Sequence, residues 1–206
     1  MNLPRVRDAA ILAGGKSRRM GRDKALVERG GDVLLACVAR VLAAGFERLW
    51  LSVHERELDE ARRSVIERLA RERLEIRIVY DADVDRRFGP LAGMEAILDA
   101  VPGPAVIFAP VDAPGIERRL HDHLRERFEA NPSLLGIVPR WHGGLEPLHA
   151  LWSVEILPEI RSRIFERKLA VRALAELPGV EVIDVDERIL GRPPHQVFLN
   201  LNEAGD

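Results

Sequence analysis

Short apolar runs alternate along the chain with segments whose apolar residues recur at helical spacing. The apolar runs have the length and composition of buried strands, and they cover residues 9–12, 49–53, 76–80, 105–111 and 134–139. The amphipathic segments between them predict helices over residues 33–44, 55–73, 89–100 and 116–130. Such alternation is typical of an α/β fold, in which helices cover both faces of a mostly parallel sheet.

The C-terminal third of the chain has a less regular pattern. Residues 146–152 predict an edge strand, residues 154–177 two helices, and residues 180–185 and 197–201 two short strands. No internal repeat, low-complexity segment or linker divides the sequence. We therefore expect a single domain over residues 1–206.

Composition narrows the class of protein. The 206 residues are 47% hydrophobic and 31% charged, as in soluble globular proteins, and a net charge of −2 argues against a nucleic-acid partner. Cys37 is the only cysteine, which excludes a disulfide framework. The sequence has neither a signal-peptide pattern nor ~18 uninterrupted apolar residues. We expect a cytoplasmic protein that does not span a membrane.

The first candidate chemistry lies between the first apolar run and Lys24. That run ends in the pair Gly14-Gly15, and a basic stretch follows that contains Arg19 and two of the chain's three lysines. Adjacent glycines let backbone N–H groups approach phosphate oxygens, and cations neutralise the phosphate charge. We interpret residues 9–24 as a strand followed by a phosphate-binding loop, although Gly14-Gly15 alone could be an ordinary turn.

Polar residues follow the other predicted strands at the point where each ends. Ser52, Asp81 and Asp112 occupy these positions. In a parallel sheet the strands' carboxyl ends share one edge, where ligands bind, so these residues should face the glycine loop. Carboxylates next to a triphosphate are suited to Mg²⁺, and we expect Asp112 to bind it. Two alternatives stay open: Asp112 could cap the following helix, and Asp83 or Asp85 could replace Asp81.

Five motifs give the chain a family resemblance. They are LAGGKSRRMGRDK at residues 12–24, GPLAG at 89–93, VDAP at 111–114, EPLHAL at 146–151 and FLNLN at 198–202. The first resembles the signature of nucleotidyltransferases, and the whole set is most similar to the molybdenum cofactor guanylyltransferases. The C-terminus departs from the pattern, because the chain stops soon after Asn202.

This resemblance implies a Rossmann-like, three-layer nucleotidyltransferase fold. It implies transfer of GMP from GTP to the terminal phosphate of molybdopterin cofactor, with release of pyrophosphate and dependence on Mg²⁺. Transient contacts with cofactor-biosynthesis proteins or molybdoenzymes follow from that role.

The resemblance also assigns roles to individual residues. Nucleotide contacts are implied for Leu12, Ala13, Gly14, Gly15, Lys24, Ser52, Asp81 and Asp112. The implied catalytic residues are Arg19, Lys24 and Asp112, with Asp112 as metal ligand. Asn200 and Asn202 are implied to contact the acceptor.

Two other readings share these motifs. A related nucleotidyltransferase could use CTP or a sugar-phosphate acceptor, because base selection depends on backbone groups and loop shape. A non-catalytic module could bind nucleotide without turning it over. The sequence alone does not determine which nucleotide base is used, which acceptor is used or which oligomeric state forms.

Overall fold

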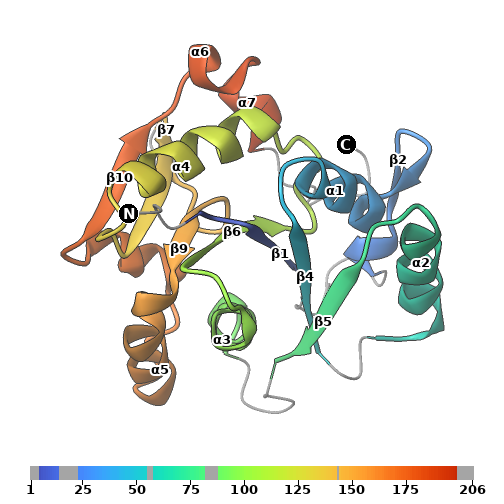
Figure 1. Ribbon diagram of the computed structural model, residues 1–206, viewed down its shortest axis with the longest axis horizontal. Helices are drawn as coiled ribbons and strands as arrows, with labels where there is room; N and C mark the ends of the chain where they lie inside the picture. The colour runs from blue at the N-terminus through green and yellow to red at the C-terminus, as the bar shows by residue number, and fades with distance from the viewer. Residues whose placement is uncertain (1–4, 14–22, 55–57, 82–87, 143, 199–206) are drawn as a thin grey trace.

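One large sheet forms the centre of the computed structural model, which describes residues 5–13, 23–54, 58–81, 88–142 and 144–198 (Figure 1). Its strands, in spatial order, are β10 (Val180–Asp184), β7 (Gly136–Trp141), β9 (Leu151–Ser153), β6 (Ala105–Pro110), β1 (Asp8–Leu12), β4 (Arg48–Val53) and β5 (Ile76–Tyr80). A further short strand, β8 (Gly144–Leu145), pairs with β7.

Most of these strands run in the same direction. β5, β4, β1 and β6 pair in parallel, as do β7 and β10, whereas β9 is antiparallel to both β6 and β7. The register places Leu12 opposite Ser52 on one side and Pro110 on the other. The carboxyl ends of the parallel strands therefore meet at one edge of the sheet, which we call the carboxyl edge.

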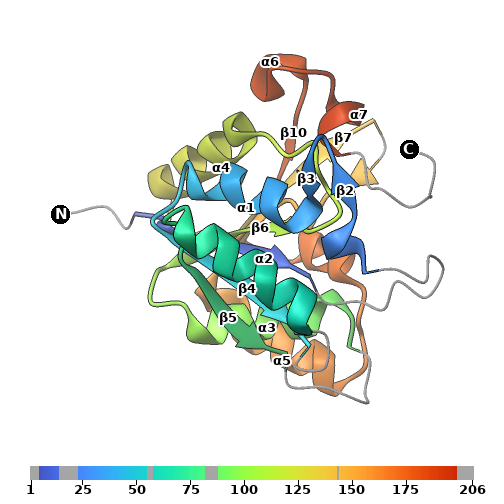
Figure 2. The same cartoon turned by 90° about the vertical axis from the view of Figure 1, so that its right-hand side faces the viewer.

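Helices cover both faces of the sheet (Figures 1 and 2). One face packs against α1 (Leu34–Ala43), α2 (Glu60–Arg71) and α4 (Arg118–Ala130), and the other against α3 (Pro90–Ala100) and α5 (Leu157–Phe165). Along β1, Ile11 joins the first core and Leu12 the second, as the alternation of side chains in a strand requires. The three-layer α/β fold with a mostly parallel sheet is thereby confirmed.

Shorter elements complete the described chain. They are η1 (Lys24–Leu26), β2 (Glu28–Arg29), β3 (Asp32–Val33), η3 (Val154–Ile156), η4 (Val171–Glu176), α6 (Glu187–Leu190) and α7 (Pro194–Val197). β2 and β3 form a hairpin that the apolar pattern did not predict, because its turn depends on positive φ at Gly30 and Gly31 and not on buried side chains.

The expected edge strand over residues 146–152 is wrong. The strand that forms is β9, which lies inside the sheet between β6 and β7. Trp152 is fully buried there and donates from Nε1 to the carbonyl oxygen of Pro147 at 2.9 Å. Its ring fits because Gly136 on β7 has no side chain: a Cβ at that position would come within 2.3 Å of the ring.

Two other C-terminal predictions also need correction. Of the two helices expected in residues 154–177, α5 forms, but the second is the 3₁₀ helix η4. The strand expected over residues 197–201 does not form in its described part, since Val197 ends α7 and Phe198 caps it. Pro194 begins that helix with a preset φ and no N–H to give to a sheet.

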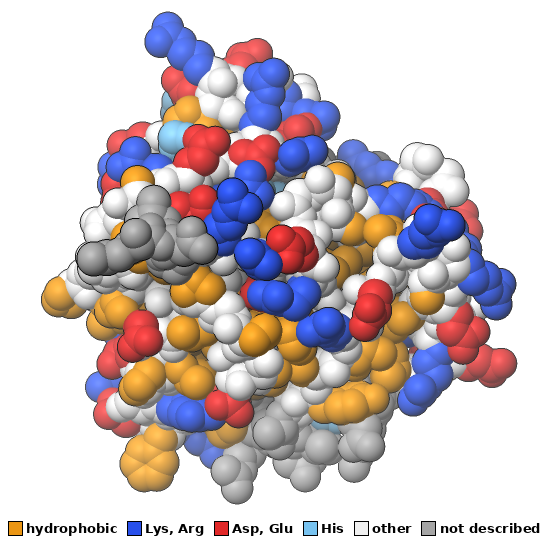
Figure 3. All heavy atoms as spheres, in the orientation of Figure 1, with side chains coloured by type: hydrophobic (Ala, Val, Ile, Leu, Met, Phe, Trp, Pro, Cys, Tyr) orange, Lys and Arg blue, Asp and Glu red, His pale blue; other side chains and the backbone are white. Residues whose placement is uncertain are grey.

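Among the described residues, no helix combines the length and apolarity needed to cross a membrane. Basic and acidic side chains lie next to one another on the face drawn in Figure 3. Surface side chains of opposite charge also form ion pairs, for example Arg40 with Glu72 and Arg140 with Asp184.

Candidate nucleotide site at the carboxyl edge

Lys24 and Asp112 meet at the carboxyl edge. Asp112 follows β6 and Lys24 begins η1, and Lys24 Nζ lies 2.7 Å from Asp112 Oδ2. Both side chains are partly exposed, so a ligand can reach them. Asp112 does not cap the following helix, because the N-cap of α4 is Glu117. A lysine and a carboxylate side by side provide the two charges that a metal-bound polyphosphate requires.

The backbone of Leu12 and Ala13 connects this pair to the neighbouring strands. Val111 donates its N–H to the carbonyl oxygen of Leu12 at 3.1 Å, and Ala13 donates to the carbonyl oxygen of Ser52 at 3.1 Å. The start of the loop predicted to bind phosphate therefore lies between the ends of β4 and β6. Asp112 is next in sequence to Val111, so the first apolar run and Asp112 share one edge.

Ser52 lies beneath the start of α3. Its hydroxyl is buried and has no hydrogen-bond partner among the described residues. A Cβ on Gly93 would come within 2.8 Å of this hydroxyl and 3.1 Å of Leu12 Cδ2, so the glycine allows α3 to approach the sheet closely. Gly89 is the N-cap of the helix and has φ 61°, a conformation that favours glycine. The GPLAG motif thus brings a helix N-terminus to the carboxyl edge.

Asp81 follows β5 at the same edge. Its N–H donates to the carbonyl oxygen of Val53 at 3.2 Å, which extends the sheet pairing by one residue. Three strand spacings, or about 14 Å, separate β5 from β6, so Asp81 and Asp112 follow strands that lie three positions apart in the sheet. The structure brings Leu12, Ala13, Lys24, Ser52, Asp81 and Asp112 to one edge. The predicted site residues Gly14, Gly15, Arg19, Asn200 and Asn202 lie outside the described residues.

Arg62 is a component of this site that the sequence pattern did not identify. It lies on α2, where it is 3% exposed, and its guanidinium pairs with Asp23 and donates to the carbonyl oxygen of Ala13 at 3.2 Å. Because α2 is rich in charged residues, the sequence alone suggested that Arg62 was exposed to solvent. Its position was a usable signal, because Arg62 shares the buried face of α2 with Val65 and Leu69.

Aromatic and polar side chains form the C-terminal side of the carboxyl edge. Phe198 stacks on Trp141, with centroids 5.9 Å apart, and meets His149 edge-on at 5.3 Å. Trp141 Nε1 donates to Glu146 Oε1 at 3.0 Å, and burial raises the pKa of the Glu146 carboxyl. Gly115 lies against α7, since a Cβ there would overlap the carbonyl oxygen of Gln196. The C-terminal segment is thus held beside the loop that carries Asp112.

The donor set at this edge fits Mg²⁺. Among the described residues, no three His, Cys, Asp or Glu side chains gather into a complete metal cage. Mg²⁺ in nucleotide enzymes is instead bound by one or two carboxylates plus substrate phosphates and water. The partly exposed Asp112 carboxylate matches that mode of binding.

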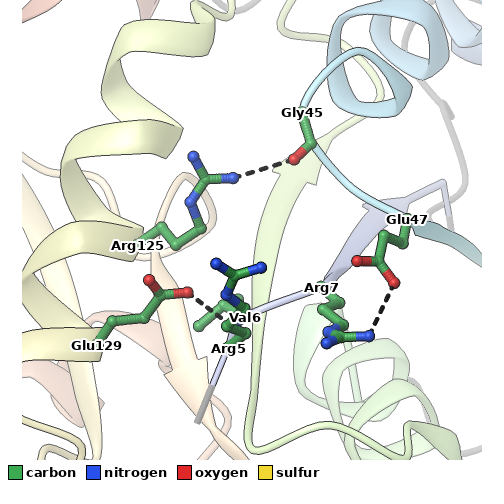
Figure 4. Close-up of a pocket in the computed structure, with 7 residues that line it drawn as sticks. All are labelled: Arg5, Val6, Arg7, Gly45, Glu47, Arg125 and Glu129. Carbon is green, nitrogen blue, oxygen red and sulfur yellow. Dashed lines mark hydrogen bonds and ion pairs between the residues drawn. The ribbon is translucent and has the colours of Figure 1, made fainter. Parts of the chain in front are cut away.

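A cavity of about 310 Å³ lies at the opposite edge of the sheet, beside the start of β1 (Figure 4). Arginines line it, but two of them are already engaged: Arg7 pairs with Glu47 at 3.2 Å, and Arg125 donates to the carbonyl oxygen of Gly45 at 3.1 Å. Glu129 accepts from the N–H of Val6 at 2.9 Å. These contacts join α4 to the start of the sheet, and we place the candidate site at the carboxyl edge.

Comparisons with known proteins agree on the fold. The MobA-like NTP transferase domain family matches residues 9–181. A relative named probable molybdenum cofactor guanylyltransferase, from Pyrococcus horikoshii, is 31% identical over 96% of this chain and 95% of its own length. The crystal structure of molybdopterin-guanine dinucleotide biosynthesis protein A from Archaeoglobus fulgidus superposes with a TM-score of 0.74 at 22% identity, covering 96% of this chain and 93% of that one. A Mycobacterium tuberculosis protein solved in complex with manganese has the same fold, with a TM-score of 0.58 at 19% identity, covering 89% of this chain and 97% of its own.

Proposed function

We propose that this chain, which belongs to the MobA-like NTP transferase domain family and is therefore a nucleotidyltransferase, transfers GMP from GTP to the terminal phosphate of molybdopterin cofactor. The proposed reaction releases pyrophosphate and depends on Mg²⁺. The observation that carries this proposal is the contact between Lys24 and Asp112 at 2.7 Å, at the edge where Leu12 and Ala13 begin the glycine loop. The name of the Pyrococcus relative supports the choice of GTP and molybdopterin.

The proposed reaction is an in-line displacement at the α-phosphorus of GTP. An oxygen of the acceptor's terminal phosphate forms the new P–O bond as the bond to the bridging oxygen breaks, and pyrophosphate leaves. Because a phosphate nucleophile is already ionised at neutral pH, no strong general base is needed. The chain therefore contributes positioning and charge, and forms no covalent intermediate.

Lys24 and Asp112 would stabilise different charges during the reaction. Asp112 would hold Mg²⁺, which when bound supplies positive charge to the α-phosphate oxygens. Lys24, together with Arg19, would neutralise the charge that develops on the departing pyrophosphate. The contact between Lys24 and Asp112 keeps each side chain oriented before substrate binds.

The remaining site residues would hold the two substrates. Leu12, Ala13, Gly14 and Gly15 would contact the nucleotide through their backbone, and Asp81 would contact it from the end of β5. A nucleotide contact was expected for Ser52, but its hydroxyl is buried, so Ser52 would instead act by positioning Ala13, whose N–H donates to the Ser52 carbonyl oxygen.

Asn200 and Asn202 would contact the acceptor, and the close approach of Gln196 to Gly115 supports this. In the cell, the product would pass to cofactor-biosynthesis proteins or molybdoenzymes by transient contact in the cytoplasm.

Pyrophosphate release with defined substrates tests the proposal. We expect release from GTP when molybdopterin cofactor and Mg²⁺ are both present, and little release when either is omitted. CTP in place of GTP should be poorly used. A preference for CTP or for a sugar phosphate would identify the related nucleotidyltransferase instead. Tight GTP binding without pyrophosphate release under any condition would identify a binding module.

A further inference from the structure

A single side chain contacts both of the described residues that flank residues 14–22, the segment predicted to bind phosphate. Arg62 Nη2 donates to the carbonyl oxygen of Ala13, immediately before the loop, at 3.2 Å. The same nitrogen donates to Asp23 Oδ1, immediately after the loop, at 2.8 Å, and Arg62 Nε pairs with the other carboxylate oxygen of Asp23. One guanidinium thus bridges Ala13 and Asp23, the residues on either side of this segment.

This guanidinium is held on a rigid element. Asp59 caps α2 and accepts from the Arg62 N–H at 2.9 Å, while Val65 and Leu69 bury the same face of the helix. Arg62 itself is 3% exposed, so it is too deeply buried to serve as a surface contact for substrate.

Asp23 transmits the position of Arg62 to the site. Asp23 is the N-cap of η1, and its Oδ1 accepts from the N–H of Ala25 at 3.0 Å. Lys24 is the first residue of that 3₁₀ turn and contacts Asp112. A continuous set of contacts therefore runs from α2 through Asp23 and η1 to Lys24.

We propose that Arg62 is a positioning residue for the nucleotide loop: it fixes the separation between Ala13 and Asp23 and thereby orients Lys24 toward the phosphates. The part that concerns phosphates depends on the function proposed above. Arginine is required because its planar guanidinium donates three hydrogen bonds in fixed directions. A lysine ammonium cannot reproduce this geometry.

The chain provides a matched control. Arg68 lies on the same helix and pairs with an aspartate, Asp32, at the β2–β3 hairpin, with Nη1 to Oδ2 at 2.9 Å. Arg68→Met removes a more exposed Arg–Asp pair from the same helix without touching Ala13 or Asp23. Arg62→Met and Arg62→Lys are compared with Arg68→Met at a temperature at which all three variants remain folded.

Two measurements separate loop positioning from general stability. Trypsin cleavage within residues 16–22, mapped by mass spectrometry, reports on the loop without any substrate. We expect at least tenfold faster cleavage there in Arg62→Met, a smaller increase in Arg62→Lys, and a change under twofold in Arg68→Met. For turnover we expect KM for GTP to rise about tenfold in Arg62→Met, with kcat also reduced, and Arg68→Met to match the wild type.

Cleavage of Arg62→Met at the wild-type rate would overturn the proposal, as would equal effects in Arg62→Met and Arg68→Met. Should Arg62→Met not fold, Arg62→Lys and Asp23→Asn provide the same comparison. A wild-type protein that releases no pyrophosphate from GTP would refute the proposed function, and the role of Arg62 in holding the loop would then be decided by trypsin cleavage alone.

Discussion

Asp112 and Lys24 are 88 positions apart in the chain and 2.7 Å apart in space. Their meeting was predictable, because a carboxylate after a buried strand and a lysine after a glycine loop both belong at the carboxyl edge of a parallel sheet. Arg62 was not predicted: its spacing from Val65 and Leu69 indicates the buried face of α2, but the sequence pattern does not identify its partner. Asp23, which is that partner, lies 39 positions away.

Replacing Asp112 by asparagine tests its role directly. Loss of the carboxylate should reduce Mg²⁺-dependent kcat by about a hundredfold or more, because charge stabilisation at the reacting phosphate is lost. The fold should remain, since a partly exposed ion pair contributes only about 0–1 kcal/mol. Pyrophosphate release and thermal unfolding measure the two effects.

Asp184→Asn is the matched control for that variant. Asp184 ends β10, which is parallel to β7, and is an exposed carboxylate paired with Arg140. Its replacement should leave turnover unchanged. Near-normal activity in Asp112→Asn would remove Asp112 from the mechanism.

His121 and His149 are buried and take no part in the proposed reaction. Their ring nitrogens have no hydrogen-bond partners among the described residues, and burial lowers the pKa of His121 to about 4 and that of His149 to about 3. The unfolded chain, with pKa values near the ordinary 6.5, binds protons at a higher pH than the folded chain does. The free energy of unfolding should therefore decrease as the pH falls below 6.5, by up to about 1.4 kcal/mol per pH unit for each imidazole.

Urea unfolding at pH 7.5 and pH 5.0 checks this pH dependence. The wild type should be markedly less stable at pH 5.0, and a His121→Leu/His149→Leu double variant should lose part of that difference. His195→Gln, at an exposed histidine, should behave as the wild type does. An identical loss of stability in the wild type and the double variant would show that other groups cause it.

At the scale of elements, the spacing of apolar residues and the residues that cap helices predicted the regular part of the fold. Strands β1, β4, β5, β6 and β7 and helices α1, α3 and α4 lie within about two residues of their predicted bounds, because one face of each is buried at the expected spacing. α2 is shorter than predicted, since Asp59 caps it. The place of β9 could not be predicted, because an apolar run that is buried on both sides looks the same at an edge as inside a sheet.

Gly136→Ala tests the interior position of β9. A methyl group there would lie 2.3 Å from the Trp152 ring, which is fully buried and cannot move aside without cost. We expect a loss of about 1–3 kcal/mol in the free energy of unfolding. Gly144→Ala on the neighbouring β8 meets its closest atom at 3.8 Å and should be nearly neutral. Equal stability of the two variants in urea would contradict this packing.

At the scale of the whole molecule, the two edges of the sheet have different roles. The carboxyl edge gathers the motif residues, whereas at the opposite edge Arg7, Glu47 and Arg125 are engaged with one another or with the backbone. Motif order along the chain could predict this polarity, because each crossover in a parallel sheet returns the chain to the same edge. The C-terminal side of the site could not be predicted, since it depends on tertiary contacts such as that of Gly115 with Gln196.

The most direct test of the central claim is a crystal structure with GTP and Mg²⁺ bound. We expect one Asp112 carboxylate oxygen about 2.0–2.1 Å from the metal, with the triphosphate beside Lys24 and the glycine loop. Nucleotide bound at the opposite edge, or at the carboxyl edge without contact to either Asp112 or Lys24, would contradict the account.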